Sequence, residues 1–221
     1  MNRRSNQGFT LVEMMIIVAI VGIAAAVTVP EFTNLRTNGR AKATARMISN
    51  AFQSARAEAI LTERTHVVMW SAVAATDACG TALPNPLVIL DDSVTQNCCI
   101  DAGETVVSVS TDPTEEFAGL NWGVTFAGAA VPEDRGGGAF TTGSSFTDQF
   151  GVQTHWVAFR NDGVPVGFTA ACNTGQVGTG AGGVYLTNGG SGGERDYAVI
   201  LSALGAPKVY SWNAASGAWT N

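Results

Sequence analysis

Histidine is scarce in this sequence, and the C-x-x-C motif is absent. The 221 residues include only two histidines, His66 and His155, and we find no set of cysteines or carboxylates at ligand spacing beside either. Without C-x-x-C, a zinc ribbon and a thioredoxin-type redox site are both excluded. We therefore expect no metal centre, no cofactor and no acid–base catalysis by histidine.

Basic residues are also scarce in the second part of the chain. From residue 66 onward there are four basic and fourteen acidic side chains, within a net charge of −6. A nucleic-acid-binding surface needs clustered lysine and arginine, so we do not expect nucleic acid as a partner. The six basic residues between 36 and 64, just before this acidic part, are Arg36, Arg40, Lys42, Arg46, Arg56 and Arg64.

Two further motifs fall short of a catalytic or ligand site. Residues 178–183, GTGAGG, match G-x-G-x-x-G, but a strand-like run follows where a dinucleotide site needs a helix. The acidic residues at 91–92 and 101–104 fit no EF-hand, so we expect solvated acidic loops there, with a calcium site as the alternative. No nucleophile–base pair stands out, so we expect no enzyme activity; a membrane-anchored hydrolase is the alternative class.

The four cysteines are Cys79, Cys98, Cys99 and Cys172. Adjacent cysteines such as Cys98 and Cys99 bond to each other only with strain. We therefore expect Cys79 to pair with one of them and Cys172 with the other, in an oxidising compartment. Buried free thiols are the alternative, because cysteine is commonly buried without a partner.

The chain has one long hydrophobic run, Phe9–Val29, whose single charge is Glu13. A helix of this length spans about 30 Å, enough to cross a bilayer. Arg3 and Arg4 precede the run, and the next basic residue is Arg36. The positive-inside rule then predicts a cytoplasmic N-terminus with the rest of the chain outside.

An ordinary secretory signal is a rival interpretation of this run, and a plain transmembrane anchor is another. The small residues of AAAVTVP, at 24–30, offer a cleavage site of the secretory type. Glu13 is unusual in the apolar region of a secretory signal and argues against that interpretation, because a carboxylate in an apolar span costs roughly 2.5–3.5 kcal/mol on insertion scales and usually has a partner or a function.

The junction G-F-T-L-V-E at 8–13, followed by the apolar run and Pro30, resembles the leader junction of type IV prepilins and type II secretion pseudopilins. The resemblance implies that residues 1–8 are a leader, that a prepilin peptidase cuts after Gly8, and that it methylates Phe9. The Phe9–Val29 run would then be a transmembrane helix. In assembly, Glu13 would neutralise the Phe9 amine of a neighbouring subunit and set the register.

Helical character continues beyond Pro30, which favours a kink near residues 28 and 29. The segment 30–65 is amphipathic, with an ending expected near Thr65. We expect its apolar face to pack under a globular head; a helix lying on the membrane surface is the alternative. The face consists of Ala41, Ala45, Ile48, Phe52, Ala55 and Ala59.

From residue 66 to 221 the pattern changes to short β-branched and aromatic runs separated by turn residues, with His66 at the junction. FRNDGVPV at 159–166 predicts a hairpin that turns on residues 161–163. Sixteen of the 26 glycines lie between 136 and 193, which predicts long loops rather than a second domain. The expected fold is α+β and pilin-like: a long N-terminal helix packed on an antiparallel sheet. Trp219 is the best candidate for an exposed interface aromatic.

The runs SARAEAILTERTHVVMW, VAFRNDGVPV, GGVYLTN and RDYAVILSALGAPKVYSW resemble the GspH/FimT family, although Ala206 and Pro207 follow Gly205 where the family often has a basic residue. The resemblance implies a minor, non-enzymatic pseudopilin near the tip of a type II secretion pseudopilus, anchored in the inner membrane with a periplasmic head. The implied partners are other major and minor pseudopilins or pilins, the prepilin peptidase and the inner-membrane assembly platform. A minor type IV pilin that initiates fibres for adhesion or DNA uptake is the alternative.

Overall fold

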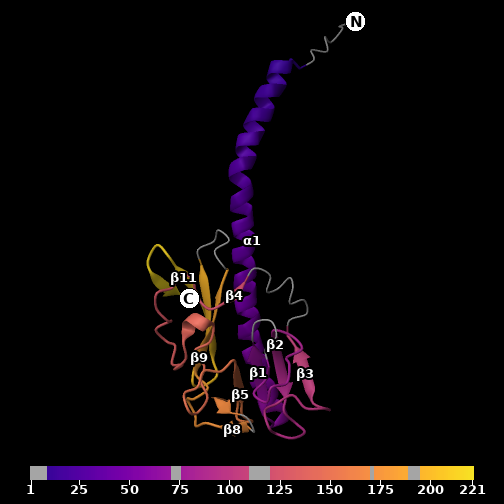
Figure 1. Cartoon of the computed structure of the whole chain (residues 1–221), viewed down its shortest axis with the longest axis vertical. Helices are drawn as coiled ribbons and strands as arrows, with labels where there is room; N and C mark the ends of the chain where they lie inside the picture. The colour runs from indigo at the N-terminus through magenta and orange to yellow at the C-terminus, as the bar shows by residue number, and fades with distance from the viewer. Residues whose placement is uncertain (1–8, 71–75, 110–119, 170–171, 189–194) are drawn as a thin grey trace.

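Figure 1 shows the computed structural model of the protein, in which a long helix carries a β-rich head at one end. The structure describes residues 9–70, 76–109, 120–169, 172–188 and 195–221. Within these ranges it leaves out the side chains of residues 27–35, 37, 108 and 173. The predicted leader, with Gly8, lies outside the described residues.

Helix α1 (Leu11–Thr62) contains 52 residues and runs without a break across Pro30. Figure 1 shows a gradual bend along its length, and the kink expected at Pro30 stays a prediction. The last helical residue is Thr62, and the C-cap is Glu63, whose backbone is left-handed (φ 56°) and whose N–H donates to the carbonyl of Ala59. Because Glu63 leaves the helical region, the helix ends three residues before the predicted Thr65.

The described part of the head contains two antiparallel five-stranded sheets, whereas the sequence predicted one. The strand order is β3-β2-β1-β5-β6 in the first sheet and β12-β11-β10-β9-β4 in the second. A two-stranded ribbon joins β7 to β8, and a short 3-10 helix, η1, lies between β4 and β5. The bounds are β1 His66–Trp70, β2 Leu87–Asp91, β3 Thr105–Ser108, β4 Asn121–Trp122, η1 Phe140–Thr142, β5 Trp156–Phe159, β6 Pro165–Val166, β7 Phe168–Thr169, β8 Asn173–Thr174, β9 Gly182–Thr187, β10 Asp196–Leu201, β11 Pro207–Asn213 and β12 Ala218–Thr220.

The predicted hairpin at 159–166 is confirmed, and it connects β5 to β6. Phe159 pairs with Pro165, and the backbone N–H of Arg160 donates to the carbonyl of Val164 at 3.1 Å. Gly163 completes the turn with φ 74°, a left-handed conformation that costs glycine little. A β-carbon at Gly163 would come within 2.6 Å of Cδ1 of Ile60, so the turn also packs tightly on the end of α1.

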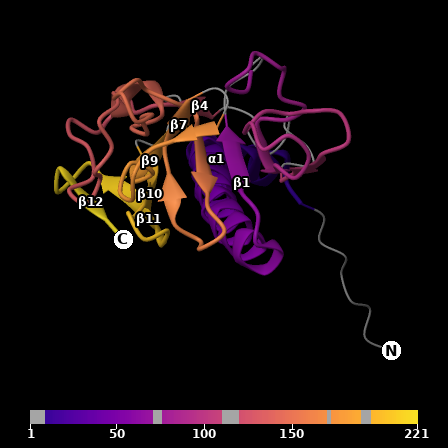
Figure 2. The same ribbon diagram turned by 90° about the horizontal axis from the view of Figure 1, so that it is seen from below.

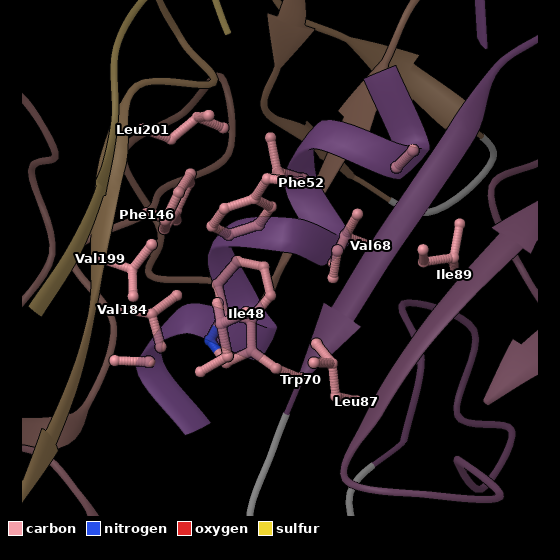
Figure 3. Close-up of a cluster of buried hydrophobic side chains, with 14 of the residues drawn as sticks. Ile48, Phe52, Val68, Trp70, Leu87, Ile89, Phe146, Val184, Val199 and Leu201 are labelled. Atoms are coloured by element: carbon pink, nitrogen blue, oxygen red, sulfur yellow. The ribbon is translucent and has the colours of Figure 1, made fainter. Parts of the chain in front are cut away.

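The main core lies between α1 and the two sheets, as Figure 2 shows with β1 on one side of the helix and β9–β11 on the other. The six residues of the predicted apolar face, Ala41 to Ala59, are all fully buried, which confirms that face. Phe52 is central: its ring lies 5.8 Å from Trp70 and 6.0 Å from Phe146 (Figure 3). The alanines of this face let the helix approach both sheets closely.

Candidate functional site

The first described residues form the N-terminal cap of α1. Thr10 is the N-cap residue, and its hydroxyl accepts the backbone N–H of Glu13 at 3.2 Å. In return, Oε2 of Glu13 accepts the backbone N–H of Thr10 at 3.2 Å and its hydroxyl at 3.3 Å. This reciprocal arrangement is a capping box. It holds the Glu13 carboxylate within one turn of Phe9, the residue predicted to become the N-terminus.

The apolar residues around the cap are not covered by any other described part of the chain. Every side chain from residue 9 to residue 26 is exposed, and Phe9 and Leu11 are 75% and 76% exposed. Apolar area left in water costs free energy in proportion to its extent, so this surface favours an apolar environment or an apolar partner. Its large members are Phe9, Leu11, Val12, Met14, Met15, Ile16, Ile17, Val18, Ile20, Val21 and Ile23.

A search of the described residues finds no helix with the length and apolar character needed to cross a membrane.

Two disulfides join the four cysteines. Cys79 is bonded to Cys99 and Cys98 to Cys172, across sequence separations of 20 and 74 residues. This is one of the two arrangements that the sequence left open. Cys98 is fully buried beside Val67 and other side chains on the face of the first sheet that is turned away from α1. The disulfides therefore tie the loops to the back of that sheet.

The acidic residues considered for calcium accept hydrogen bonds from their own loop. Asp92 is fully buried, and its carboxylate accepts the backbone N–H groups of Cys98 at 2.8 Å and Asn97 at 3.2 Å. Burial raises the pKa of Asp92, and the nearby carboxylate of Glu104 adds to the rise. Asp101 accepts the side-chain amide of Asn97 at 2.8 Å. Through these hydrogen bonds the carboxylates of Asp92 and Asp101 hold the loop of residues 92–104 in its conformation.

The two histidines lie in different surroundings. His66 begins β1, as predicted for the junction of helix and strand, and its Nε2 lies 4.0 Å from Oδ1 of Asp91. His155 precedes β5, and burial lowers the pKa of its imidazole, which favours the neutral ring. The glycine motif at 178–183 leads into strand β9 rather than into a helix, in agreement with the sequence-based expectation.

The remaining sequence candidates serve the packing of the head. Trp219, expected to be exposed, is only partly so: its Nε1 donates to the carbonyl of Ala129 at 2.8 Å, and its ring lies 5.8 Å from Tyr185. That expectation is met only in part, because the short strand β12 folds the C-terminus back onto β11. No pattern in the sequence predicted strand β12.

A contact between two turns was missed by sequence reasoning. The guanidinium of Arg56 on α1 donates to the carbonyl of Gly205 at 3.4 Å, and a β-carbon on Gly205 would lie 3.0 Å from the carbonyl oxygen of Gly163. The β5–β6 and β10–β11 turns thus meet beside the last turns of α1. Residues 149 positions apart make this contact, so no local pattern could predict it.

The comparisons with known proteins bear on the N-terminal segment. The profile of the prokaryotic N-terminal methylation motif matches residues 3–29. The search of curated proteins and the search of solved structures gave no match. The matched residues include the G-F-T-L-V-E junction, the Thr10–Glu13 capping box and most of the exposed apolar surface of α1. Together with the α+β architecture, the motif supports a type IV pilin-like protein that assembles with other pilins and is cut by a prepilin peptidase.

Proposed function

We propose that this chain is a minor pseudopilin of the GspH/FimT kind that lies near the tip of a type II secretion pseudopilus. In this role it has no enzyme activity. It is cleaved after Gly8, methylated at Phe9 and anchored in the inner membrane by the Phe9–Val29 segment, with its head in the periplasm. The observation that carries the proposal is the methylation motif at residues 3–29, on a helix whose apolar side chains from Phe9 to Ile23 are uncovered.

The assembly mechanism rests on Glu13. Cleavage would create an amine at Phe9, and the Glu13 carboxylate of an axially shifted neighbour can pair with that amine. Two charges that are each costly in hydrocarbon would then become one hydrogen-bonded pair. In the single chain Glu13 accepts hydrogen bonds from Thr10, so assembly exchanges a contact within one helix for a contact between subunits.

The oxidised cysteines are consistent with this placement. Structural disulfides persist in oxidising compartments, and the bacterial periplasm is one of them. Both disulfides, Cys79–Cys99 and Cys98–Cys172, lie in the head, which the proposal puts on the periplasmic side.

A minor type IV pilin that starts fibres for adhesion or DNA uptake is the second candidate. DNA binding by the head would need a cluster of free cations. Only four of the residues from 66 onward are basic, and Arg160 is already paired with Asp162 at 2.9 Å. We therefore favour secretion over DNA uptake.

The test is the intact mass of the protein purified from its native membrane, compared with the Gly8→Ala and Glu13→Ala variants. We expect the native chain to begin at methylated Phe9 and Gly8→Ala to stay full length. Glu13→Ala should be cut but should fail to enter filaments, whereas Glu13→Asp, as the matched control, keeps the charge. A chain that begins beyond Ala26 would identify an ordinary signal peptide and overturn the proposal.

A further inference from the structure

The helix-facing side of the first sheet is only partly covered by α1. Val68 and Trp70 of β1 are fully buried beneath the helix, whereas Val107 of β3 is 52% exposed. A groove of about 490 Å³ opens between the helix and the outer strands. One wall is a stripe of α1 that includes Asn50, Ser54 and Glu58, and the opposite wall includes Ile89 of β2 and Val107.

Strand β3 forms the rim of this groove, and it is the last strand of the first sheet within the described residues. The N–H of Val109 donates inward to the carbonyl of Leu87 at 3.1 Å. Backbone groups alternate in direction along an antiparallel strand, so the N–H and C=O of Val106 and Ser108 point away from β2. An edge of this kind is a template for another strand.

One end of the groove is acidic and incompletely bonded. Oδ1 of Asp91 is buried and has no hydrogen-bond partner among the described residues, although His66 Nε2 lies 4.0 Å away. Arg64 lies 3.9 Å from the other oxygen, beyond hydrogen-bond distance. Glu58 lines the same groove from α1. The Asp91 side chain is 22% exposed, so its accessible part and Glu58 can accept a charge-assisted hydrogen bond from a cationic N–H group of a ligand in the groove.

We propose that this groove binds an extended segment of another polypeptide, which adds a strand to β3 and places a lysine or arginine at Asp91 and Glu58. The groove-facing residues of β3, Thr105 and Val107, repeat every second position, and an added strand matches that spacing with its own alternate side chains. The bound segment would therefore alternate apolar residues on the groove side and carry one cation at the Asp91 end. The proposal is independent of the pilin assignment.

The experiment selects ligands from a random decapeptide display library on the full-length protein in lipid nanodiscs. We expect the enriched peptides to alternate β-branched residues and to carry a basic residue. Val107→Glu and Asp91→Asn should each weaken their binding about tenfold, a change of about 1.4 kcal/mol. The matched controls are Val94→Glu, since Val94 is a 57% exposed valine outside the groove, and Asp162→Asn in the β5–β6 turn; neither should alter binding.

Amide hydrogen exchange in the presence of the selected peptide separates strand addition from other contacts. Strand addition requires slower exchange at the N–H groups of Val106 and Ser108, because these become hydrogen-bonded. Binding that is weakened by Val107→Glu but leaves both amides unprotected would indicate a helical occupant and overturn the proposal. Failure to enrich peptides, or enriched peptides insensitive to Val107→Glu, would overturn it as well.

Discussion

Thr10 and Glu13 cap the N-terminus of α1 reciprocally, with 3.2 Å between the Glu13 amide nitrogen and the Thr10 hydroxyl and 3.2 Å between the Thr10 amide nitrogen and the Glu13 carboxylate. The carboxylate is therefore engaged with its own helix before any neighbour is present. A negative charge at a helix N-terminus also interacts favourably with the helix dipole. Both contacts stabilise the first turn of the helix in a subunit that has not yet assembled.

Removal of the cap should loosen the first turn of α1. Thr10→Ala deletes the hydroxyl that accepts the Glu13 N–H, and loss of an N-cap typically costs about 1 kcal/mol. We expect the Glu13 amide to exchange about fivefold faster in Thr10→Ala than in the parent protein in nanodiscs, which follows from that free energy. Thr10→Ser retains the hydroxyl and should exchange as the parent does. Equal rates in Thr10→Ala and Thr10→Ser would show that the box does not stabilise this turn.

The two disulfides should differ in how much they stabilise the head. In the chain-entropy account, a disulfide stabilises more when it closes a longer loop. Because the separations are 74 and 20 residues, replacing Cys98 and Cys172 by alanine should lower the free energy of unfolding by about 1 kcal/mol more than replacing Cys79 and Cys99.

Urea denaturation of the two double variants measures this difference. Peptide mapping of the parent protein under non-reducing conditions provides the control, since it identifies the bonded pairs directly. Equal losses of stability, or a larger loss for the Cys79–Cys99 pair, would contradict the loop-length argument.

Phe52 should be among the costliest core positions. It is fully buried between α1 and both sheets, with rings of Trp70, Phe146 and Phe159 within 6.3 Å. Phe52→Ala leaves a cavity and should lower the free energy of unfolding by about 3–5 kcal/mol. Phe150 is 74% exposed, so Phe150→Ala should change stability by less than about 0.5 kcal/mol. Thermal unfolding of both variants tests this contrast, and similar losses would place Phe52 outside the core.

Asp92 should make stability depend on pH in a direction opposite to that of an ion-paired carboxylate. Burial raises its pKa in the folded state, so the folded protein binds the proton more tightly than the unfolded chain does. The stability that this proton contributes is present below the unfolded pKa, about 4, and is lost as pH rises through the raised value.

Comparison with Asp92→Asn isolates this effect, because the amide does not titrate. Between pH 4 and pH 7, the parent should lose stability relative to Asp92→Asn. Asp162→Asn serves as the control because Asp162 is 45% exposed and lies in a surface ion pair with Arg160. A stability difference between parent and Asp92→Asn that stays constant with pH would show that burial does not hold the proton on Asp92.

Local patterns predicted the elements of the fold more reliably than their arrangement. The apolar face from Ala41 to Ala59, the helix-to-strand junction at His66 and the 159–166 hairpin each depend on residues close together in sequence, and each is present. The short strands β7, β8 and β12 were missed because two or three residues carry too little pattern. The division of the head into two sheets was also missed, since strand order depends on contacts between distant segments.

Among the buried polar groups, Asp196 illustrates what sequence reasoning could not find. Its carboxylate accepts the backbone N–H groups of Thr125, Phe126 and Ala127, about 70 positions away. The carboxylate thereby satisfies three donors of a loop that would otherwise be short of partners. Nothing around residue 196 distinguishes this aspartate from a solvated one.

Features that act through adjacent residues can be recognised from the sequence alone: the methylation motif at residues 3–29, the Glu13 charge near the start of the apolar run, and the amphipathic helix beyond it. These features depend on the order of residues along one helix, and the 3.6-residue period of a helix shows which of those residues share a face. The cysteine pairing, the contact of Arg56 with Gly205 and the groove beside β3 depend instead on the three-dimensional packing. Each of these brings together residues remote in sequence, and their proximity results from close packing of α1 against two sheets rather than from any local preference.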